Sequence, residues 1–270
     1  MVDAEEDDIE GEVIQDEDTG LESAVVSLGG GVRKRVTMNT HAVQQKNQAA
    51  RVLYEFASAL RGYLKAYILP SLQILLAMAT DKHSSDVRSS ATLAIGKMFD
   101  ALTHAVQLGY IQNNPAQNIS LEAVLNSCLT KLLEAVREEA DSVSRACAAE
   151  ALRDVLQACY LSGTEAEDGT RSGFAICPSI PASEKLVQEL LTRCAESLLR
   201  RHSKADAIQK NDGYDEEDRA GVSQELEEED DLLTTFADTF GQLLKLHGEA
   251  FMTEFDHFIA PAFSPYLRAD

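Results

Sequence analysis

The fold class is decided by the stretch Asp86-Val87-Arg88-Ser89-Ser90-Ala91-Thr92-Leu93-Ala94-Ile95-Gly96. Its apolar side chains return every three or four residues, which is the spacing of one face of an α-helix. Ser84 or Ser85 precedes it and can cap a helix, since a serine hydroxyl accepts a hydrogen bond from the first free backbone N–H groups. We therefore predict a helix that begins there and ends near Gly109.

The same pattern returns in the stretch Ser142-Val143-Ser144-Arg145-Ala146-Cys147-Ala148-Ala149-Glu150-Ala151-Leu152. When Arg88 is aligned with Arg145, small and aliphatic residues coincide along both helices, and each copy follows a leucine-rich helix. Two weaker echoes pair residues 52–57 with 232–237 and residues 67–72 with 258–263. Helix pairs that recur with similar turns between them predict an α-α superhelix (a HEAT-type solenoid of stacked pairs), in which each unit packs only on its neighbours.

From Thr40 onward the chain reads as all-α, with about eight helices in antiparallel pairs. The predicted ranges are 40–60, 63–79, 84–109, 120–136, 141–163, 183–198, 232–246 and 249–267. Pro70, Pro261 and Pro265 fall inside predicted helices and are expected to bend them. Strand is predicted at one place only, around Gly29-Gly30-Gly31, where two β-branched runs indicate a hairpin or an extended linker. Residues 163–182 are predicted to be loop.

The net charge of −21 is concentrated in two segments. Residues 1–22 hold eleven acidic and no basic residues, and residues 212–231 hold eleven acidic residues and Arg219. The rest of the chain carries 23 acidic and 23 basic side chains. We predict an acidic disordered segment (1–23), a hairpin or linker (24–37), repeat helices (38–208), an acidic insertion between helices (209–230) and further repeat helices (231–270).

Several functional classes are disfavoured by the residues present. A net-negative surface repels phosphate, so no direct nucleic-acid binding is expected, and the longest nearly apolar stretch, 66–79, is too short to span a membrane. The five cysteines lack C-x-x-C spacing, and the six histidines form no metal-binding pair. Because no nucleophile–base constellation is visible, we predict no enzymatic activity, no metal and no cofactor. The cysteine pattern favours a reducing compartment.

The segment from Asp86 to Gly96, after a helix and a polar turn, resembles a HEAT repeat. That resemblance implies a ladder in which the turn aspartate, Asp86, and the arginines Arg88 and Arg145 join successive repeats by charge-assisted hydrogen bonds. In the second repeat Ser142 stands in the aspartate position, and the third lacks an arginine in the corresponding place.

The order of features over residues 24–270 is similar to the karyopherin-beta family, with the importin beta-3 type of nuclear import receptor as the nearest match. The acidic stretches 214–218 and 227–231, which precede a Leu-Leu helix, resemble the acidic inter-helix segment of those receptors. The resemblance implies an interior fragment of a receptor in cytoplasm and nucleus, which binds protein cargo, often basic, Ran-GTP and Phe-Gly nucleoporins. Apolar end faces are expected to favour self-association.

Two candidate surfaces follow. A basic partner is expected at nine acidic residues: Asp215, Glu216, Glu217, Asp218, Glu227, Glu228, Glu229, Asp230 and Asp231. A groove for Phe-Gly side chains is expected at Phe251, Phe255 and Phe258. The alternatives are a solvated acidic insertion, aromatic side chains that belong to the core, and a structural HEAT scaffold with no role in nuclear import.

Overall fold

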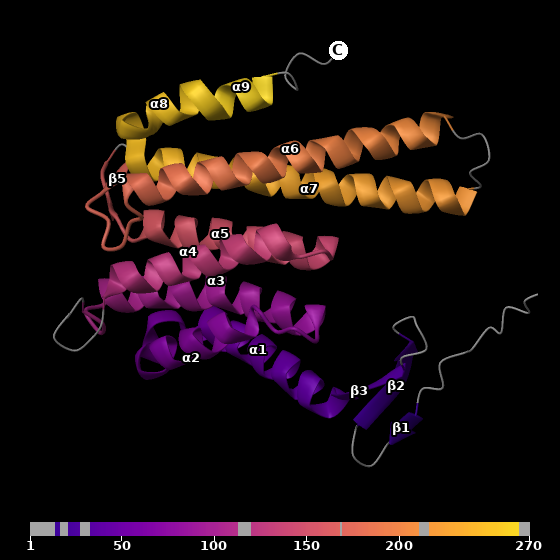
Figure 1. Ribbon diagram of the computed structural model, residues 1–270. Coiled ribbons are helices and arrows are strands. Elements are labelled where there is room, and N and C mark those ends of the chain that lie inside the picture. Colours follow the sequence, from indigo (N-terminus) through magenta and orange to yellow (C-terminus); the bar gives the residue numbers. More distant parts are fainter. Residues whose placement is uncertain are drawn as a thin grey trace, which may run out of the picture. The chain divides into compact units, whose positions relative to one another are not determined.

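The computed structural model describes residues 14–16, 21–27, 33–112, 120–167, 169–210 and 216–264 (Figure 1). The chain divides into two units, residues 1–49 and 50–270, which are described separately. The first unit contains an antiparallel sheet of three strands, β1 (Ile14–Asp16), β2 (Leu21–Ser27) and β3 (Arg33–Asn39).

The predicted hairpin at 24–37 is longer than expected, because its strands extend outward to Leu21 and Asn39. Strand β1 lies within the segment 1–23 that was predicted to be disordered, so that prediction is wrong for residues 14–16 and 21–23. Its remaining residues lie outside the described part of the chain. Asn39 then opens the first helix, since its Oδ1 accepts a hydrogen bond of 2.9 Å from the N–H of Ala42.

The second unit is built from helices in the predicted order. They are α1 (Thr40–Leu60, which begins in the first unit), the 3-10 turn η1 (Arg61–Leu64), α2 (Lys65–Met78), α3 (Ser85–Gln107), α4 (Leu121–Glu138), α5 (Ser142–Leu161), α6 (Ile180–Lys210) and α7 (Glu216–His247). Three predicted starts agree with the structure. Ser84, Ser120 and Asp141 each accept a hydrogen bond from the N–H three residues later.

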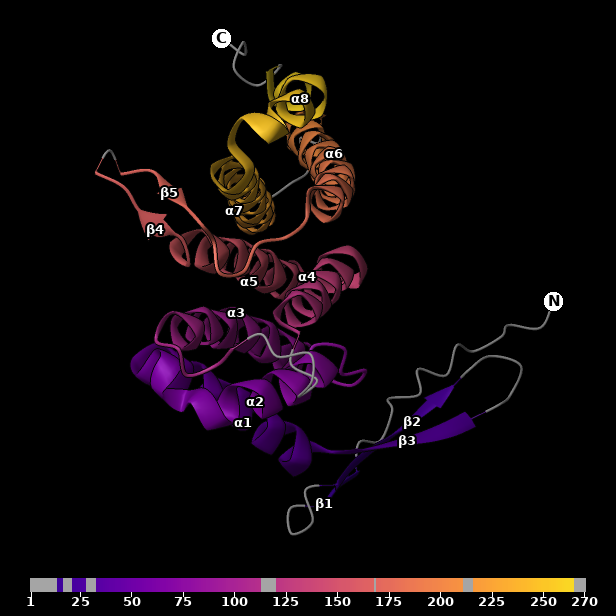
Figure 2. The same ribbon diagram turned by 90° about the vertical axis from the view of Figure 1, so that its left-hand side faces the viewer.

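These helices form three layers, α2 with α3, α4 with α5, and α6 with α7 (Figure 2). Within the second unit, α3, α5 and α7 lie one above another, while α4 and α6 lie to the other side. Alanine explains the close packing of this column: Ala91, Ala94, Ala148 and Ala151 are buried and let the helices approach. The all-α, stacked-pair prediction is confirmed.

Two local predictions were wrong. Helix α7 begins at Glu216, so residues 216–230 are helix and not an insertion between helices. The predicted loop 163–182 contains a short hairpin, β4 (Thr164–Glu165) with β5 (Arg171–Ser172), and the start of α6. The hairpin is tied to the end of α5, because the Arg171 guanidinium donates to the carbonyl oxygen of Leu161 at 3.1 Å.

The last predicted helix, 249–267, is divided into short segments. They are η3 (Gly248–Phe251), α8 (Met252–Glu254), the π-helical turn η4 (Phe255–Ile259) and α9 (Ala260–Phe263). Pro261 lies in the first turn of α9, where its missing N–H costs no hydrogen bond. Pro265 lies outside the described residues.

Candidate functional site

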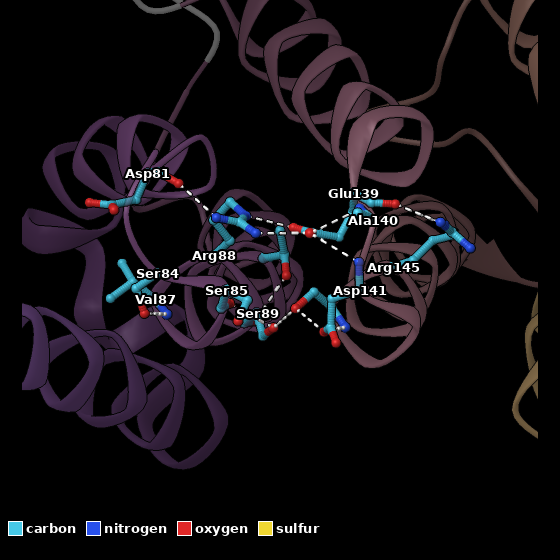
Figure 3. Close-up of polar contacts among 12 residues, drawn as sticks. Asp81, Ser84, Ser85, Val87, Arg88, Ser89, Glu139, Ala140, Asp141 and Arg145 are labelled. Carbon is cyan, nitrogen blue, oxygen red and sulfur yellow. Dashed lines mark hydrogen bonds and ion pairs between the residues drawn. The ribbon is translucent and has the colours of Figure 1, made fainter. Parts of the chain in front are cut away.

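A charged ladder joins the layers along one edge of the stack (Figure 3). The Arg88 guanidinium, on α3, donates two hydrogen bonds to the Glu139 carboxylate, with Nε–Oε2 at 2.5 Å and Nη2–Oε1 at 2.8 Å. Its third nitrogen, Nη1, donates to the carbonyl oxygen of Asp81 at 2.9 Å. A bidentate ion pair thus joins the first layer to the end of α4 in the second layer, and bidentate pairs are the stronger arrangement of arginine and carboxylate.

The Glu139 carboxylate is also held by backbone N–H groups of the residues that follow it in the chain. Its Oε1 accepts bonds from the backbone N–H groups of Ala140 (3.1 Å) and Asp141 (3.4 Å), and its side chain is only 7% exposed. The hydrogen bond from Arg88 lowers the pKa of Glu139 below its ordinary value, although burial acts in the opposite direction. The carboxylate is therefore ionised at neutral pH and fixed in one orientation.

Arg145, on α5, continues the ladder through the backbone. Its Nη2 and Nε donate to the carbonyl oxygen of Glu139 at 2.6 and 3.2 Å. Burial, together with the nearby Arg200, lowers the pKa of Arg145. Glu139 therefore accepts hydrogen bonds from Arg88 on its carboxylate and from Arg145 on its carbonyl oxygen.

A second set of contacts lies beside the ladder. The Asp141 carboxylate accepts bonds from the N–H and the hydroxyl of Ser144, at 2.8 and 2.6 Å. Those hydrogen bonds lower the pKa of Asp141. Ser89 on α3 donates to the Ser144 hydroxyl at 2.7 Å. This chain of hydroxyls therefore adds a neutral bond between the first two layers, next to the charged one.

The structure places the predicted ladder residues unequally. Arg88 and Arg145 lie in the ladder, whereas Asp86 is exposed at the start of α3 and the carboxylate comes from Glu139. Glu139 was missed because its position after the last turn of α4, just before the Asp141 cap, is recognisable only once two helices are known to meet there. The two acidic residues of Glu139-Ala140-Asp141 were the available signal.

Within the third layer, a residue of the acidic run joins α7 to α6. Glu229, on α7, is 6% exposed and accepts a bond from the Nε of Arg200 on α6 at 2.7 Å, with Ser197 as a further donor. Burial alone would raise the pKa of Glu229, but the bonds from Arg200 and Ser197 and the charge of Arg145 outweigh it and lower the pKa. The arginine absent from the expected place is supplied by α6.

Glu228, Glu229 and Asp230 of the acidic run are bonded to residues of other helices, although the Asp230 side chain stays 51% exposed. Glu228 accepts a bond from the Ser142 hydroxyl at 2.6 Å, and Asp230 pairs with Arg201 at 2.6 Å. Glu227 and Asp231 are exposed, and Asp238 is exposed further along the same helix. Spacings of four and seven residues place these last three on one side of α7. We call Glu227, Asp231 and Asp238 the acidic stripe.

The remaining predicted acidic residues lie at the beginning of α7. Glu216, Glu217 and Asp218 form its first turn, and Asp215 lies outside the described residues.

The predicted aromatic groove is wrong for Phe251, which is fully buried in the core. Phe255 is half-buried against the same core, and Phe258 is 46% exposed. Another groove, of about 190 Å³, lies between the outer helices α4 and α6. Its apolar lining is Leu129, Leu133 and Leu186.

The described residues offer little for bond-making chemistry. Among them, no group of three or more His, Cys, Asp or Glu side chains is placed to hold a metal ion. Ser183 and His247 lie 2.8 Å apart, but Ser183 is fully buried, so the pair ties the start of α6 to the end of α7. In the part of the chain that the structure describes, no helix is long and apolar enough to cross a membrane.

Comparison with known proteins finds a family match over the last third of the chain and a likeness in fold over most of it. Residues 182–269, which include nearly all of α6 and the elements from α7 to α9, match the family model Importin repeat 6. The fold is similar to the karyopherin Kap121p bound to the extreme C-terminus of the protein phosphatase Cdc14p, with a TM-score of 0.63 and 16% identity. The predicted resemblance to the karyopherin-beta family is confirmed. The importin beta-3 subtype stays a prediction.

Further structures of Kap121p are also similar to this chain. With Kap121p bound to Pho4p the TM-score is 0.56 at 18% identity over 91% of this chain. The match to the Cdc14p complex covers 93% of this chain but 20% of Kap121p, so the chain spans about a fifth of that receptor's length. No curated protein sequence matches the chain. At these identities the likeness to Kap121p concerns the fold.

Proposed function

We propose that this chain is a segment of a nuclear transport receptor and contacts basic protein cargo through the acidic stripe on α7. The observation that carries the proposal is the importin-repeat match over residues 182–269, because all three residues of the stripe lie within it. The similar Kap121p structures hold Cdc14p and Pho4p, which supports a protein as the partner.

The stripe suits a basic partner because its neighbours are already neutralised. Glu229 and Asp230 are paired with Arg200 and Arg201, so they contribute little to the field outside the protein. Glu227, Asp231 and Asp238 keep their charge exposed on a helix that the ladder holds in place. Exposed charges of one sign attract an oppositely charged partner over about a Debye length, roughly 8 Å at physiological salt.

The remaining functions belong to the same proposal. We also propose that Phe-Gly side chains enter the groove between α4 and α6, whose lining includes Leu129, Leu133 and Leu186. Control by Ran-GTP and passage between cytoplasm and nucleus follow from the karyopherin resemblance. The mechanism is binding and release by a stacked array, without bond-making chemistry, because small rotations at each layer add along such a stack.

A binding titration tests the stripe. A fluorescent Lys/Arg-rich peptide is titrated with the wild-type chain and with a Glu227→Gln, Asp231→Asn, Asp238→Asn variant. Three exposed charge contacts are worth about 0.2–1 kcal/mol each, so the variant should bind roughly tenfold more weakly.

The matched control, Glu55→Gln, Glu122→Gln, Glu167→Gln, removes three exposed carboxylates from other elements and should keep most of the affinity. Equal affinity of the stripe variant and this control would mean that the peptide senses only net charge, and would refute the stripe as the cargo site.

Capture on immobilised Ran tests the transport role separately. Retention with GTP-loaded but not GDP-loaded Ran is the expected result for a segment that carries Ran contacts. Equal or absent capture in both states would remove Ran control from the proposal and favour the structural HEAT scaffold.

A further inference from the structure

The two layer junctions differ in what surrounds their arginine. At the first junction Arg88 donates to the carbonyl oxygen of Asp81 and to the Glu139 carboxylate. At the second, Arg145 makes the same kind of backbone contact, to the carbonyl oxygen of Glu139, so Glu139 lies between the two arginines (Figure 3). In the described part of the chain, however, Arg145 forms no ion pair, whereas Arg88 forms one with Glu139. The second junction therefore lacks the carboxylate that completes the first.

The carboxylate that acts on Arg145 from α7 is already bonded elsewhere. Glu229 accepts hydrogen bonds from Arg200 and Ser197. Burial, followed by the charge of Arg200, lowers the pKa of Arg145, although the charge of Glu229 acts in the opposite direction. The Arg145 guanidinium therefore carries a positive charge that its surroundings do not fully offset. Partly buried charges of this kind are typical of binding sites.

Arg145 lines a polar cleft of about 580 Å³ between α5, α6 and α7. That volume lies within the range of ligand sites in proteins, roughly 300–1,000 Å³. Two further cations line the cleft, and each is paired: Arg200 with Glu229 at 2.7 Å and Lys204 with Glu225 at 2.6 Å. Among the described residues that line the cleft, Arg145 is therefore the cation available to an anion from outside the chain.

The charge of the whole lining restricts the kind of ligand. Four carboxylates line the cleft beside the three cations, so a free anion would be repelled as well as attracted. They are Asp141, Glu225, Glu228 and Glu229. Gln224 also lines the cleft and precedes Asp231 of the acidic stripe by seven residues, so cleft and stripe lie along the same side of α7. A ligand that suits both carries an oxyanion for Arg145 and basic groups for the surrounding carboxylates.

We propose that the cleft binds an oxyanion, a carboxylate or a phosphate, that lies next to the basic residues of a mixed-charge cargo segment. Its oxygens take the place before Arg145 that the Glu139 carboxylate takes before Arg88. The basic residues of the same segment contact the acidic stripe. This inference rests on the proposed function and narrows it, from basic cargo to cargo in which an acidic or phosphorylated residue adjoins the basic ones.

Peptide titrations test the oxyanion site. Three fluorescent peptides share one Lys/Arg-rich block and differ in the residues that flank it on both sides, which are glutamate, glutamine or phosphoserine. The wild-type chain should bind the glutamate peptide roughly tenfold more tightly than the glutamine peptide, the gain expected from one charge-assisted pair. The net charge of −21 alone predicts the opposite order. Equal affinities, or tighter binding of the glutamine peptide, would overturn the proposal.

The phosphoserine peptide distinguishes the two sources of the oxyanion. Tighter binding than that of the glutamate peptide identifies phosphate as the preferred group, and weaker binding identifies a carboxylate.

Two substitutions assign the preference to Arg145. Arg145→Gln removes the guanidinium and should abolish the preference for the glutamate peptide, while a circular dichroism melt checks that the fold is kept. The matched control, Arg51→Gln, removes an exposed arginine on α1 and should keep the preference. A preference that survives in Arg145→Gln would show that the oxyanion binds elsewhere and would refute the site.

Nuclear magnetic resonance of the wild-type chain gives a readout that needs no substitution. The Nε–Hε signal of Arg145 should shift when the glutamate peptide is added and stay in place with the glutamine peptide; a signal unmoved by both contradicts the proposal. The glutamine peptide reports on the acidic stripe alone. If it binds through the stripe while glutamate adds nothing, the oxyanion site fails and the proposed cargo contact stands.

Discussion

Replacing Glu139 by alanine should uncouple the first layer from the second. The substitution removes both bonds to Arg88 and two acceptor contacts to the backbone N–H groups of Ala140 and Asp141. Arg145 keeps its partner, because its bonds go to the carbonyl oxygen that alanine retains. Breaking a buried ion pair costs about 3–5 kcal/mol, and Arg88, 24% exposed, can partly rehydrate, so we expect a loss of about 3 kcal/mol.

Urea unfolding followed by circular dichroism measures this loss. Because each layer contacts only its neighbours, we expect a broadened transition in Glu139→Ala as the first layer unfolds before the others. Glu138→Ala is the matched control: its side chain is 60% exposed and pairs at the surface with the adjacent Arg137, so its cost should stay below about 0.5 kcal/mol.

The pH dependence supplies a second readout. The folded-state pKa of Glu139 lies below the ordinary 4.5, so its stabilisation is present above that value and is lost as the pH falls through the lowered pKa. The difference in unfolding free energy between wild type and Glu139→Ala should therefore shrink in acid. A loss under about 0.5 kcal/mol at neutral pH, or one that does not change in acid, would refute the ladder as a coupling element.

Three further outcomes are expected. Gly62→Ala should cost about 1–3 kcal/mol in a thermal melt, because its Cβ would lie 2.7 Å from the backbone of α3, whereas Gly241→Ala, with open space around it, should stabilise α7 slightly. Burial lowers the pKa of His247, so the stability that neutral His247 provides is present above about pH 6.5 and is lost as the pH falls below it. The His247→Gln variant should therefore lose less stability than the wild type over that range. An equal loss in both proteins would exclude His247 as the source of the acid sensitivity. Burial raises the pKa of the thiols of Cys128, Cys159 and Cys194, to about 12 for Cys128 and Cys194. Titration of the native protein with a thiol reagent should therefore show these three cysteines protected and the other two reacting faster. Fast reaction at all five would contradict the burial of these three.

The repeat architecture could be predicted because its determinants are local. A cap such as Ser84 or Asp141, followed by apolar residues at helical spacing, specifies a helix start without reference to the rest of the chain. The aligned arginines Arg88 and Arg145 pointed to a shared edge, and both lie on it.

The acidic run was misjudged because charge was taken as evidence of solvent exposure. Glu228, Glu229 and Asp230 are bonded to Ser142, Arg200 and Arg201, which lie 29 to 86 residues away in the chain. Composition shows that a segment is acidic, but only the packing of α6 against α7 shows which carboxylates are neutralised.

The aromatic prediction failed for a related reason. Phe251, Phe255 and Phe258 are spaced as one helical face, yet the chain there changes from a 3-10 turn to a short α-helix and then a π-helical turn. Each change alters the rotation per residue, so Phe251 turns inward while Phe258 turns outward. A regular helix was assumed where none exists.

Hydrogen exchange of the chain with and without a saturating basic peptide tests the central claim most directly. We expect added protection along α7 around Glu227, Asp231 and Asp238, with the α4–α6 groove unchanged. Protection at that groove or at α1 and α2, with α7 exchanging as it does without peptide, would contradict the account.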